Sequence, residues 1–307
     1  MLPKVNAFGH KIVPIPDILK DNRVYNLICD VLTFQSSVVS GKDNRQLVKT
    51  FLDDILSKRD QDNLADIVRN KAVEMVGGFE GLKKIRDVRI QDIITSFKKF
   101  IESSNQHIRG KVLDLGCGNG LVASGLKNPK MKSVELCDVV DYRAEGVKSW
   151  KFTTIPTHGR LPYKDNEFDS VLAITVLHHA SNPVELLKEI SRVTKEKLYS
   201  METIVGVTPK SRTVEAVNDQ RFELEKKFSS LDKNQQMMHA SFHDWFYNDV
   251  VQGGIDVPMN FATDIQWQKL FSELGLNIVV RYMIGFDQRT SGEYHVIYVC
   301  EKQQIKV

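Results

Sequence analysis

Cysteine is scarce in this chain of 307 residues, and long apolar runs are missing. The four cysteines (Cys29, Cys117, Cys137 and Cys300) lie far apart and form no C-x-x-C pair, which argues against a disulfide framework or a zinc site and favours a reducing compartment. No apolar stretch approaches the roughly 20 residues that span a bilayer. The first 20 residues do not resemble a signal peptide. We therefore expect a cytoplasmic protein that is not attached to a membrane.

Excess charge of one sign is also missing. The formal net charge is +3, and the sequence contains no concentrated block of lysine and arginine. Tight binding to phosphate backbones usually needs such a block, so the sequence gives no strong signal for nucleic acid. Apolar residues make up 42% and charged residues 26%, which is ordinary for a globular protein with one elaborated domain or two.

The first hundred residues carry the periodicity of amphipathic helices. Apolar residues recur at three-to-four spacing in 47–56, 64–76 and 90–101, and Gly77-Gly78 ends the second of these stretches. We predict an N-terminal helical extension over residues 1–107. The extension either packs as a helical layer on the rest of the protein or serves as a lid over a ligand cleft.

From about residue 108, strand patterns alternate with helix patterns, which indicates an α/β fold with a parallel sheet and crossover helices. The second domain is predicted to cover 108–307, with a lid-like insertion at 206–262. Two β-rich runs near the end, 276–284 and 294–300, are predicted to form an antiparallel hairpin. The predicted strands are 111–115, 133–139, 151–155, 169–175 and 197–205, and the predicted helices are 119–127, 183–194 and 264–274.

The most informative segment is Lys-Val-Leu-Asp-Leu-Gly-Cys-Gly-Asn-Gly at 111–120. A short buried-strand pattern is followed by glycines at every second position, which let the backbone turn sharply and leave room for a ligand against it. A dinucleotide fingerprint, G-x-G-x-x-G, needs a third glycine at position 121, which is Leu121. The segment therefore calls for a different ligand.

This segment resembles the first motif of class I S-adenosylmethionine-dependent methyltransferases. The stretch 158–183, which contains Leu-Pro-Tyr-Lys-Asp-Asn-Glu-Phe-Asp-Ser-Val and then Leu-His-His, resembles a later motif of the same superfamily. The resemblance implies a doubly wound, mostly parallel, seven-stranded Rossmann-like sheet that ends in an antiparallel hairpin. It also implies S-adenosyl-L-methionine as the cofactor and methyl transfer as the reaction.

The resemblance and the chemistry of the cofactor together suggest a set of binding residues. Asp114 suits the methionine ammonium group and can hold the glycine loop. Asp138 lies 24 residues later, where a strand-ending carboxylate can hold a ribose diol, and Asp141 is a weaker rival for that role. Relatives commonly carry an acid at the position of His158, so adenine recognition should differ here. The complete predicted set is Asp114, Gly116, Cys117, Gly118, Asn119, Gly120, Asp138, Val139, His158, Gly159, Arg160, Thr175 and Val176.

The acceptor and the catalytic residues are less constrained by the sequence. Methyl transfer is an in-line displacement that needs a base only when the acceptor has a proton to lose. His243 and His178 are the candidate proton acceptors. The aromatic stretch of the insertion either packs as an ordinary helix or contacts the substrate, and the predicted contacts are Phe242, Trp245, Phe246, Tyr247 and Glu202. No metal site is expected, because the adjacent His178 and His179 point to different sides.

We therefore predict transfer of a methyl group to an oxygen, nitrogen or carbon atom of a small molecule. Methylation of RNA or protein is the alternative, and a non-catalytic scaffold of the same fold is a further one. Thr175-Val176-Leu177-His178 stands where a base-methylating enzyme would carry N-P-P-Y or N-P-P-F, which disfavours methylation of base amino groups. The oligomeric state is left open.

Overall fold

The computed structural model of the chain describes residues 4–58, 63–211, 219–253 and 257–303. Its contacts divide the chain into two compact units. The helical unit comprises Met1–Asp92, Ile204–Phe261 and Gly285–Tyr294, and the sheet unit comprises Ile93–Thr203, Ala262–Ile284 and His295–Val307. Of the predicted insertion at 206–262, residues 212–218 and 254–256 lie outside the described residues. The lid roles and the boundary at residue 107 stay predictions.

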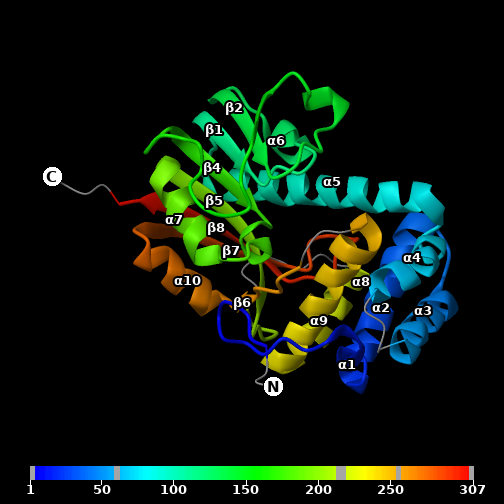
Figure 1. Ribbon diagram of the computed structural model, residues 1–307. Helices are drawn as coiled ribbons and strands as arrows, with labels where there is room; N and C mark the ends of the chain where they lie inside the picture. The colour runs from blue at the N-terminus through cyan, green and yellow to red at the C-terminus, as the bar shows by residue number, and fades with distance from the viewer. Residues whose placement is uncertain (1–3, 59–62, 212–218, 254–256, 304–307) are drawn as a thin grey trace. The chain divides into compact units, whose positions relative to one another are not determined.

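A mostly parallel sheet forms the centre of the sheet unit (Figure 1). The strand order is β3-β2-β1-β4-β5-β8-β7, with the short β6 paired to β5. The pairs among β1 to β5 are parallel, whereas β8 runs antiparallel to β5. The predicted doubly wound sheet with antiparallel strands at one edge is therefore confirmed. The strands are β1 (Gly110–Leu115), β2 (Met131–Asp138), β3 (Lys151–Thr154), β4 (Phe168–Ile174), β5 (Thr194–Val205), β6 (Ala262–Thr263), β7 (Leu276–Gly285) and β8 (His295–Lys302).

The central strand β1 is buried along almost its whole length, as expected for a parallel strand that is covered on both faces. Val112 lies opposite Val134 of β2 and Ser170 of β4. At the start of β4, Asp169 accepts a hydrogen bond from the Lys111 amide at 2.8 Å. This contact fixes the relative register of β1 and β4, and with it the level at which the two strands end. Asp169 thus has a structural role.

The helices of the sheet unit begin at recognisable caps. The Asn182 side chain accepts from the Glu185 amide, and Thr263 forms a reciprocal capping box with Gln266. Both helices fall within about one residue of the predicted bounds. The described helices of this unit are α6 (Leu121–Leu126), α7 (Pro183–Val193), α10 (Asp264–Glu273) and the one-turn helices η1 (Glu145–Val147) and η2 (Leu177–His179).

Two of the three predicted N-terminal helices lie in the helical unit, and most of the third, 90–101, lies in the sheet unit. The helical unit also contains several helices that the sequence did not indicate. The longest of these is α2, which begins at the Asp21 cap and ends at Gly41 in the left-handed conformation (φ 72°). The last residues of α5 belong to the sheet unit. The described helices are α1 (Ile15–Ile18), α2 (Asn22–Ser40), α3 (Arg45–Ser57), α4 (Leu64–Met75), α5 (Gly78–Ser104), α8 (Gln220–Ser229), α9 (Lys233–Trp245) and the π-helix η3 (Phe246–Gly253).

The connection between β7 and β8 differs from a simple hairpin loop, because it packs into the helical unit. Arg289 forms an ion pair with Asp92 at 2.7 Å, and the Thr290 hydroxyl donates to the Ile85 carbonyl. The Phe286 amide donates to Glu225 of α8 at 3.0 Å. The segment Gly285–Tyr294, which connects the antiparallel strands β7 and β8, therefore belongs to the helical unit.

Among all described residues, no helix is both long and apolar enough to cross a membrane.

Candidate functional site

The turn from β1 into α6 is the centre of the site in the sheet unit. Gly116, Gly118 and Gly120 all have positive φ, at 67°, 53° and 75°. A side-chain carbon on Gly116 would lie 2.6 Å from Val176 Cγ2, so glycine is required for the turn to pack against the loop after β4. A side-chain carbon on Gly118 would meet nothing within 4 Å. The turn is therefore closed on one side and open at Gly118.

Hydrogen bonds from the end of β2 hold this turn in place. The amides of Gly116 and Cys117 both donate to the Cys137 carbonyl, at 2.9 and 3.1 Å. The Gly118 amide donates to Asp138 Oδ2 at 2.8 Å. The Asp138 carboxylate at the end of β2 thus orders the glycine turn that follows the neighbouring strand β1. Such an arrangement is usual where a ligand lies beyond the carboxyl ends of parallel strands.

Asp114 lies beneath the turn and is 3% exposed. Its Oδ2 atom has no hydrogen-bond partner among the described residues. Burial, and then the nearby Asp138 carboxylate, raise the pKa of Asp114 to about 7. A buried carboxylate oxygen without a partner is unfavourable unless a cation or a donor completes it. The Asp114 carboxylate therefore fits an amino group of a ligand as its hydrogen-bond donor.

Asp138 is better placed than Asp141 to hold a diol. Its two oxygens accept from the amides of Gly118 and Val139, and burial raises its pKa in spite of these bonds. Asp141 instead forms a bidentate ion pair with Arg143, with both contacts at 2.9 Å. Since the Arg143 guanidinium occupies both oxygens of Asp141, the geometry favours the Asp138 carboxylate as a ligand contact.

The loop after β4 is organised by Glu202 of β5. Thr175 begins the loop in the left-handed conformation (φ 55°), and its amide donates to the Met201 carbonyl at 2.7 Å. The Glu202 carboxylate accepts from the amides of Val176 and Leu177, at 3.3 and 3.0 Å. His178 Nδ1 lies 2.7 Å from Glu202 Oε2, and both side chains are fully buried. Glu202 thus holds the backbone of this loop and the imidazole of His178.

Four residues predicted for the cofactor, Val139, His158, Gly159 and Arg160, are exposed, and Asn119 is partly buried. His158 Nδ1 lies 2.9 Å from the Ser181 hydroxyl, which precedes α7. Gly159 has a φ of 89°, and Arg160 lies 3.6 Å from Asp165. Val139 is 42% exposed directly after Asp138. The structure therefore places all thirteen predicted cofactor residues in the sheet unit: Asp114 and Asp138 lie at the ends of β1 and β2, and the others lie after the parallel strands.

The predicted acceptor contacts of the insertion lie in the helical unit and are buried there. Phe242 and His243 are 0% exposed, and Tyr247 is 3% exposed. The Phe246 ring packs edge-on against Phe51 of α3, with centroids 5.6 Å apart. Burial lowers the pKa of His243 to about 3, so its imidazole is neutral at physiological pH. The ring of Trp245, the remaining member of the set, packs edge-on against the ring of Phe242.

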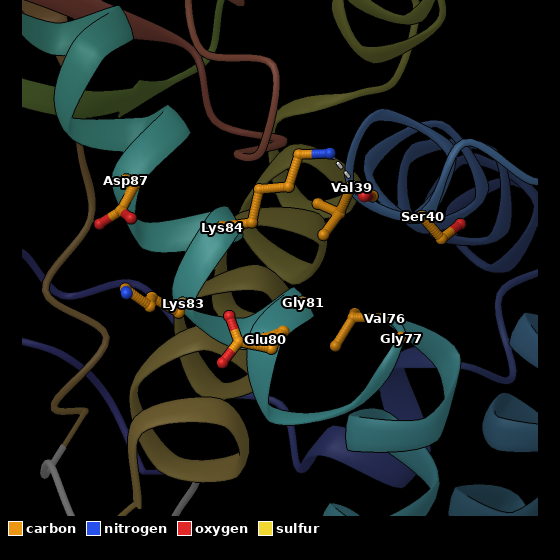
Figure 2. Close-up of a pocket in the computed structure, with 9 residues that line it drawn as sticks. All are labelled: Val39, Ser40, Val76, Gly77, Glu80, Gly81, Lys83, Lys84 and Asp87. Atoms are coloured by element: carbon orange, nitrogen blue, oxygen red, sulfur yellow. Dashed lines mark hydrogen bonds between the residues drawn. The ribbon is translucent and has the colours of Figure 1, made fainter.

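Two further features of the helical unit were not predicted from the sequence. One is a cavity of about 400 Å³, shown in Figure 2, at which the Lys84 ammonium donates to the Val39 carbonyl near the end of α2. This contact satisfies a carbonyl in the last turn of the helix, which is a structural role. The other is Gln35, a buried amide on α2 that belongs to no motif. The cavity is lined by Val39, Ser40, Val76, Gly77, Glu80, Gly81, Lys83, Lys84 and Asp87.

Comparison with known proteins bears on the sheet unit. Residues 113–199 match the family model described as a methyltransferase domain. An uncharacterised protein of Methanocaldococcus jannaschii is 35% identical over 102 residues, which are 32% of this chain and 47% of that protein. Cycloartenol-C-24-methyltransferase 1 of Oryza sativa subsp. japonica is 28% identical over 144 residues, which are 43% of this chain and 42% of that protein. The chain therefore spans less than half the length of these curated relatives.

Among solved structures, a similar chain is a putative methyltransferase in complex with the Trm112 methyltransferase activator from Haloferax volcanii. It is 15% identical, the TM-score is 0.48, and the match covers 72% of this chain and 95% of that one.

Proposed function

We propose that this chain, which contains a class I S-adenosylmethionine-dependent methyltransferase domain, transfers a methyl group to an oxygen, nitrogen or carbon atom of a small-molecule acceptor. The observation that carries the proposal is the buried Asp114 carboxylate, with an unpartnered oxygen, beneath a glycine turn that is open at Gly118. A scaffold that binds no ligand gains nothing from such a carboxylate, because its burial costs free energy that only a ligand returns.

S-adenosyl-L-methionine supplies an electrophilic methyl group when bound. Asp114 receives the ammonium group, and the Gly118 region leaves room for the ligand to lie against the backbone. Asp138 accepts the ribose hydroxyls with the lone pairs that its two amide contacts leave free. The further cofactor contacts that we propose are Gly116, Cys117, Asn119, Gly120, Val139, His158, Gly159, Arg160, Thr175 and Val176.

The chain's own residues then position the acceptor and receive its proton where it has one. His178 and His243 are the proposed proton acceptors. For His178, the Glu202 carboxylate lies 2.7 Å from Nδ1 and so orients the imidazole. For His243, the low pKa makes the imidazole a hydrogen-bond acceptor and a weak base. The proposed substrate contacts are Glu202, Phe242, Trp245, Phe246 and Tyr247.

A small-molecule acceptor is supported by two considerations. The rice relative is named for methylation of cycloartenol, which is a small molecule. The net charge of +3 lacks the basic concentration that tight binding of RNA usually needs. A cytoplasmic location is part of the same proposal, and the four buried cysteines, none of which forms a disulfide, support it.

Calorimetry with S-adenosylhomocysteine tests the cofactor assignment. We expect binding by the native chain, a loss of roughly tenfold or more in Asp138→Asn because a ribose contact is removed, and little change in Asp141→Asn. Asp141 is the matched control, because it lies three residues after Asp138 but is paired with Arg143. A folded native chain that takes up neither S-adenosylhomocysteine nor S-adenosylmethionine contradicts the proposal.

Transfer of a labelled methyl group onto fractionated cell extract tests the acceptor class. Label in small metabolites is expected. Label in RNA or protein contradicts the acceptor class while leaving the reaction intact, and an absence of label with intact cofactor binding contradicts the reaction itself.

A further inference from the structure

The helical unit contains buried polar atoms that have no hydrogen-bond partner among the described residues. They include both nitrogens of His243, the hydroxyl of Tyr247 and both amide atoms of Gln35. The three side chains are 0%, 3% and 2% exposed. Buried polar groups in folded proteins are nearly always hydrogen-bonded, and a group left unpaired loses its water contacts without a return. Several such groups in one unit call for an occupant that completes them.

Gln35 lies on α2, His243 on α9 and Tyr247 on η3, which directly follows α9, and α2 and α9 run in the same direction. At the start of both helices, the side-chain amide of Gln235 in α9 donates to the carboxylate of Asp21, the N-cap of α2, at 2.9 Å. Further along, a side-chain carbon on Gly292 would lie 2.7 Å from Val31 Cγ1 of α2 and 2.8 Å from His243 Nε2 of α9. Val31 and His243 therefore lie at the same level.

The next turn brings the remaining two residues together. Gln35 follows Val31 by four positions and so lies on the same face of α2. Tyr247 follows His243 by four positions, and the two rings are 6.4 Å apart between centroids and 24° from parallel. Gln35, His243 and Tyr247 thus form one group between α2 and the end of α9, which we call the polar triad.

The triad is uncharged and is bordered by aromatic rings. Desolvation lowers the pKa of His243 to about 3 and raises the pKa of Tyr247, so both are neutral. The charges that act on Tyr247 are Arg89, whose guanidinium lies 5.8 Å from the Tyr247 ring centroid, and Glu293, which lies 3.7 Å from Arg89. These two charges compensate each other, so this pair does not favour a charged ligand.

The rings that border the triad add an apolar surface. Phe242 packs edge-on against His243 at 5.8 Å, and Phe246 packs edge-on against Tyr247 at 5.3 Å. His239 Nε2 donates to the Gly292 carbonyl, 2.9 Å away, and so takes no ligand through that nitrogen. Neutral hydrogen-bonding groups beside aromatic faces match an uncharged ring that carries a hydroxyl or carbonyl group.

We propose that the helical unit binds a small uncharged ring compound through its hydroxyl or carbonyl group, which is hydrogen-bonded by the polar triad. The binding itself follows from the helical unit alone. Only the identification of this ligand as the methyl acceptor rests on the proposed function.

A pair of tyrosine variants tests the proposal, with phenol as the probe and benzene as the apolar control. Tyr247→Phe removes a hydroxyl that has no hydrogen-bond partner in the described part of the chain, whereas Tyr199→Phe removes a buried hydroxyl that donates to the His107 carbonyl at 2.8 Å. We expect Tyr247→Phe to raise the melting temperature of the ligand-free chain and to weaken phenol binding roughly tenfold. Tyr199→Phe is expected to lower the melting temperature and to leave phenol binding unchanged.

Calorimetry and thermal unfolding of the full chain provide both readouts. Saturable binding of phenol, with none of benzene, supports the proposal when Tyr247→Phe and Gln35→Leu both weaken it. The proposal is overturned if the native chain does not bind phenol saturably, or if Tyr247→Phe binds it like the native chain. It is also overturned if Tyr247→Phe loses as much stability as Tyr199→Phe, since the hydroxyl then has a structural partner.

The same samples separate this proposal from the proposed function. Binding of S-adenosylhomocysteine is measured alongside phenol in every variant. A native chain that binds phenol but not S-adenosylhomocysteine contradicts the methyltransferase assignment and leaves the helical-unit site in place. A native chain that binds S-adenosylhomocysteine but not phenol removes the helical-unit site alone.

Discussion

If Asp114 receives the ammonium group of the cofactor as proposed, its buried carboxyl makes cofactor binding dependent on pH. Its pKa is raised to about 7 in the ligand-free chain, mainly because burial disfavours the charged form. An ammonium group binds favourably only to the ionised carboxylate. Below about pH 7, binding of S-adenosylhomocysteine must therefore release the proton of Asp114, and the affinity must fall as the pH falls.

The size of the effect follows from linkage. With a pKa of about 7 in the free chain and ionisation in the complex, affinity falls by roughly 30-fold between pH 8 and pH 5.5, which is ~2 kcal/mol. The stability of the ligand-free chain changes in the opposite direction. The folded chain retains this proton above the unfolded pKa of about 3.8, so folding is favoured at low pH and this contribution is lost as the pH rises toward 7.

Calorimetry of S-adenosylhomocysteine binding at several pH values, in buffers with different ionisation enthalpies, measures both the affinity and the protons released. Asp114→Asn should bind weakly at pH 8 and show no pH dependence from this residue. Glu135→Gln is the matched control, because Glu135 is equally buried but is paired with Lys151 at 2.8 Å. A native affinity that is constant from pH 5.5 to pH 8, or a slope that persists in Asp114→Asn, refutes the reasoning.

Two further predictions concern the loops that frame the site. Gly116→Ala should reduce both thermal stability and S-adenosylhomocysteine affinity more than Gly118→Ala, because only the former places a carbon 2.6 Å from Val176 Cγ2; equal effects in unfolding and calorimetry would count against this packing. Glu202→Gln should lower stability by roughly 1–3 kcal/mol in denaturant unfolding, because an amide nitrogen in the place of Oε2 cannot accept from the His178 backbone amide, and an unchanged midpoint would show that the loop after β4 does not depend on this hydrogen bond.

The parallel sheet could be predicted from the sequence because its signals are local. A buried-strand run, a glycine turn and a capped helix each lie within a few residues, and β1, α7 and α10 begin where those signals place them. By contrast, α2 was not predicted. Its apolar residues from Leu27 to Leu32 are nearly continuous, so the helical period is difficult to distinguish from a buried strand.

The contacts that complete the sites could not be predicted, because they join residues far apart in the chain. Glu202 was predicted as an acid at the end of β5, but its bonds to Val176 and Leu177 depend on the pairing of β4 with β5. The segment 285–294 was predicted as a simple connection, and its packing against α5 and α8 follows from long-range contacts alone. Gln35 acquires its significance only beside Tyr247. Periodicity describes a face of a helix but does not identify what covers it.

Both candidate sites contain buried polar groups that a ligand would complete, and pH distinguishes them. Asp114 titrates near neutrality, whereas the polar triad holds no group that does, since the pKa of His243 is about 3 and that of Tyr247 is raised. Phenol affinity should therefore remain constant from pH 5.5 to pH 8 while S-adenosylhomocysteine affinity changes roughly 30-fold in the same samples. A phenol affinity that follows the pH dependence of the cofactor would mean that the two ligands share one titrating group, and the helical unit would then not hold a separate neutral site.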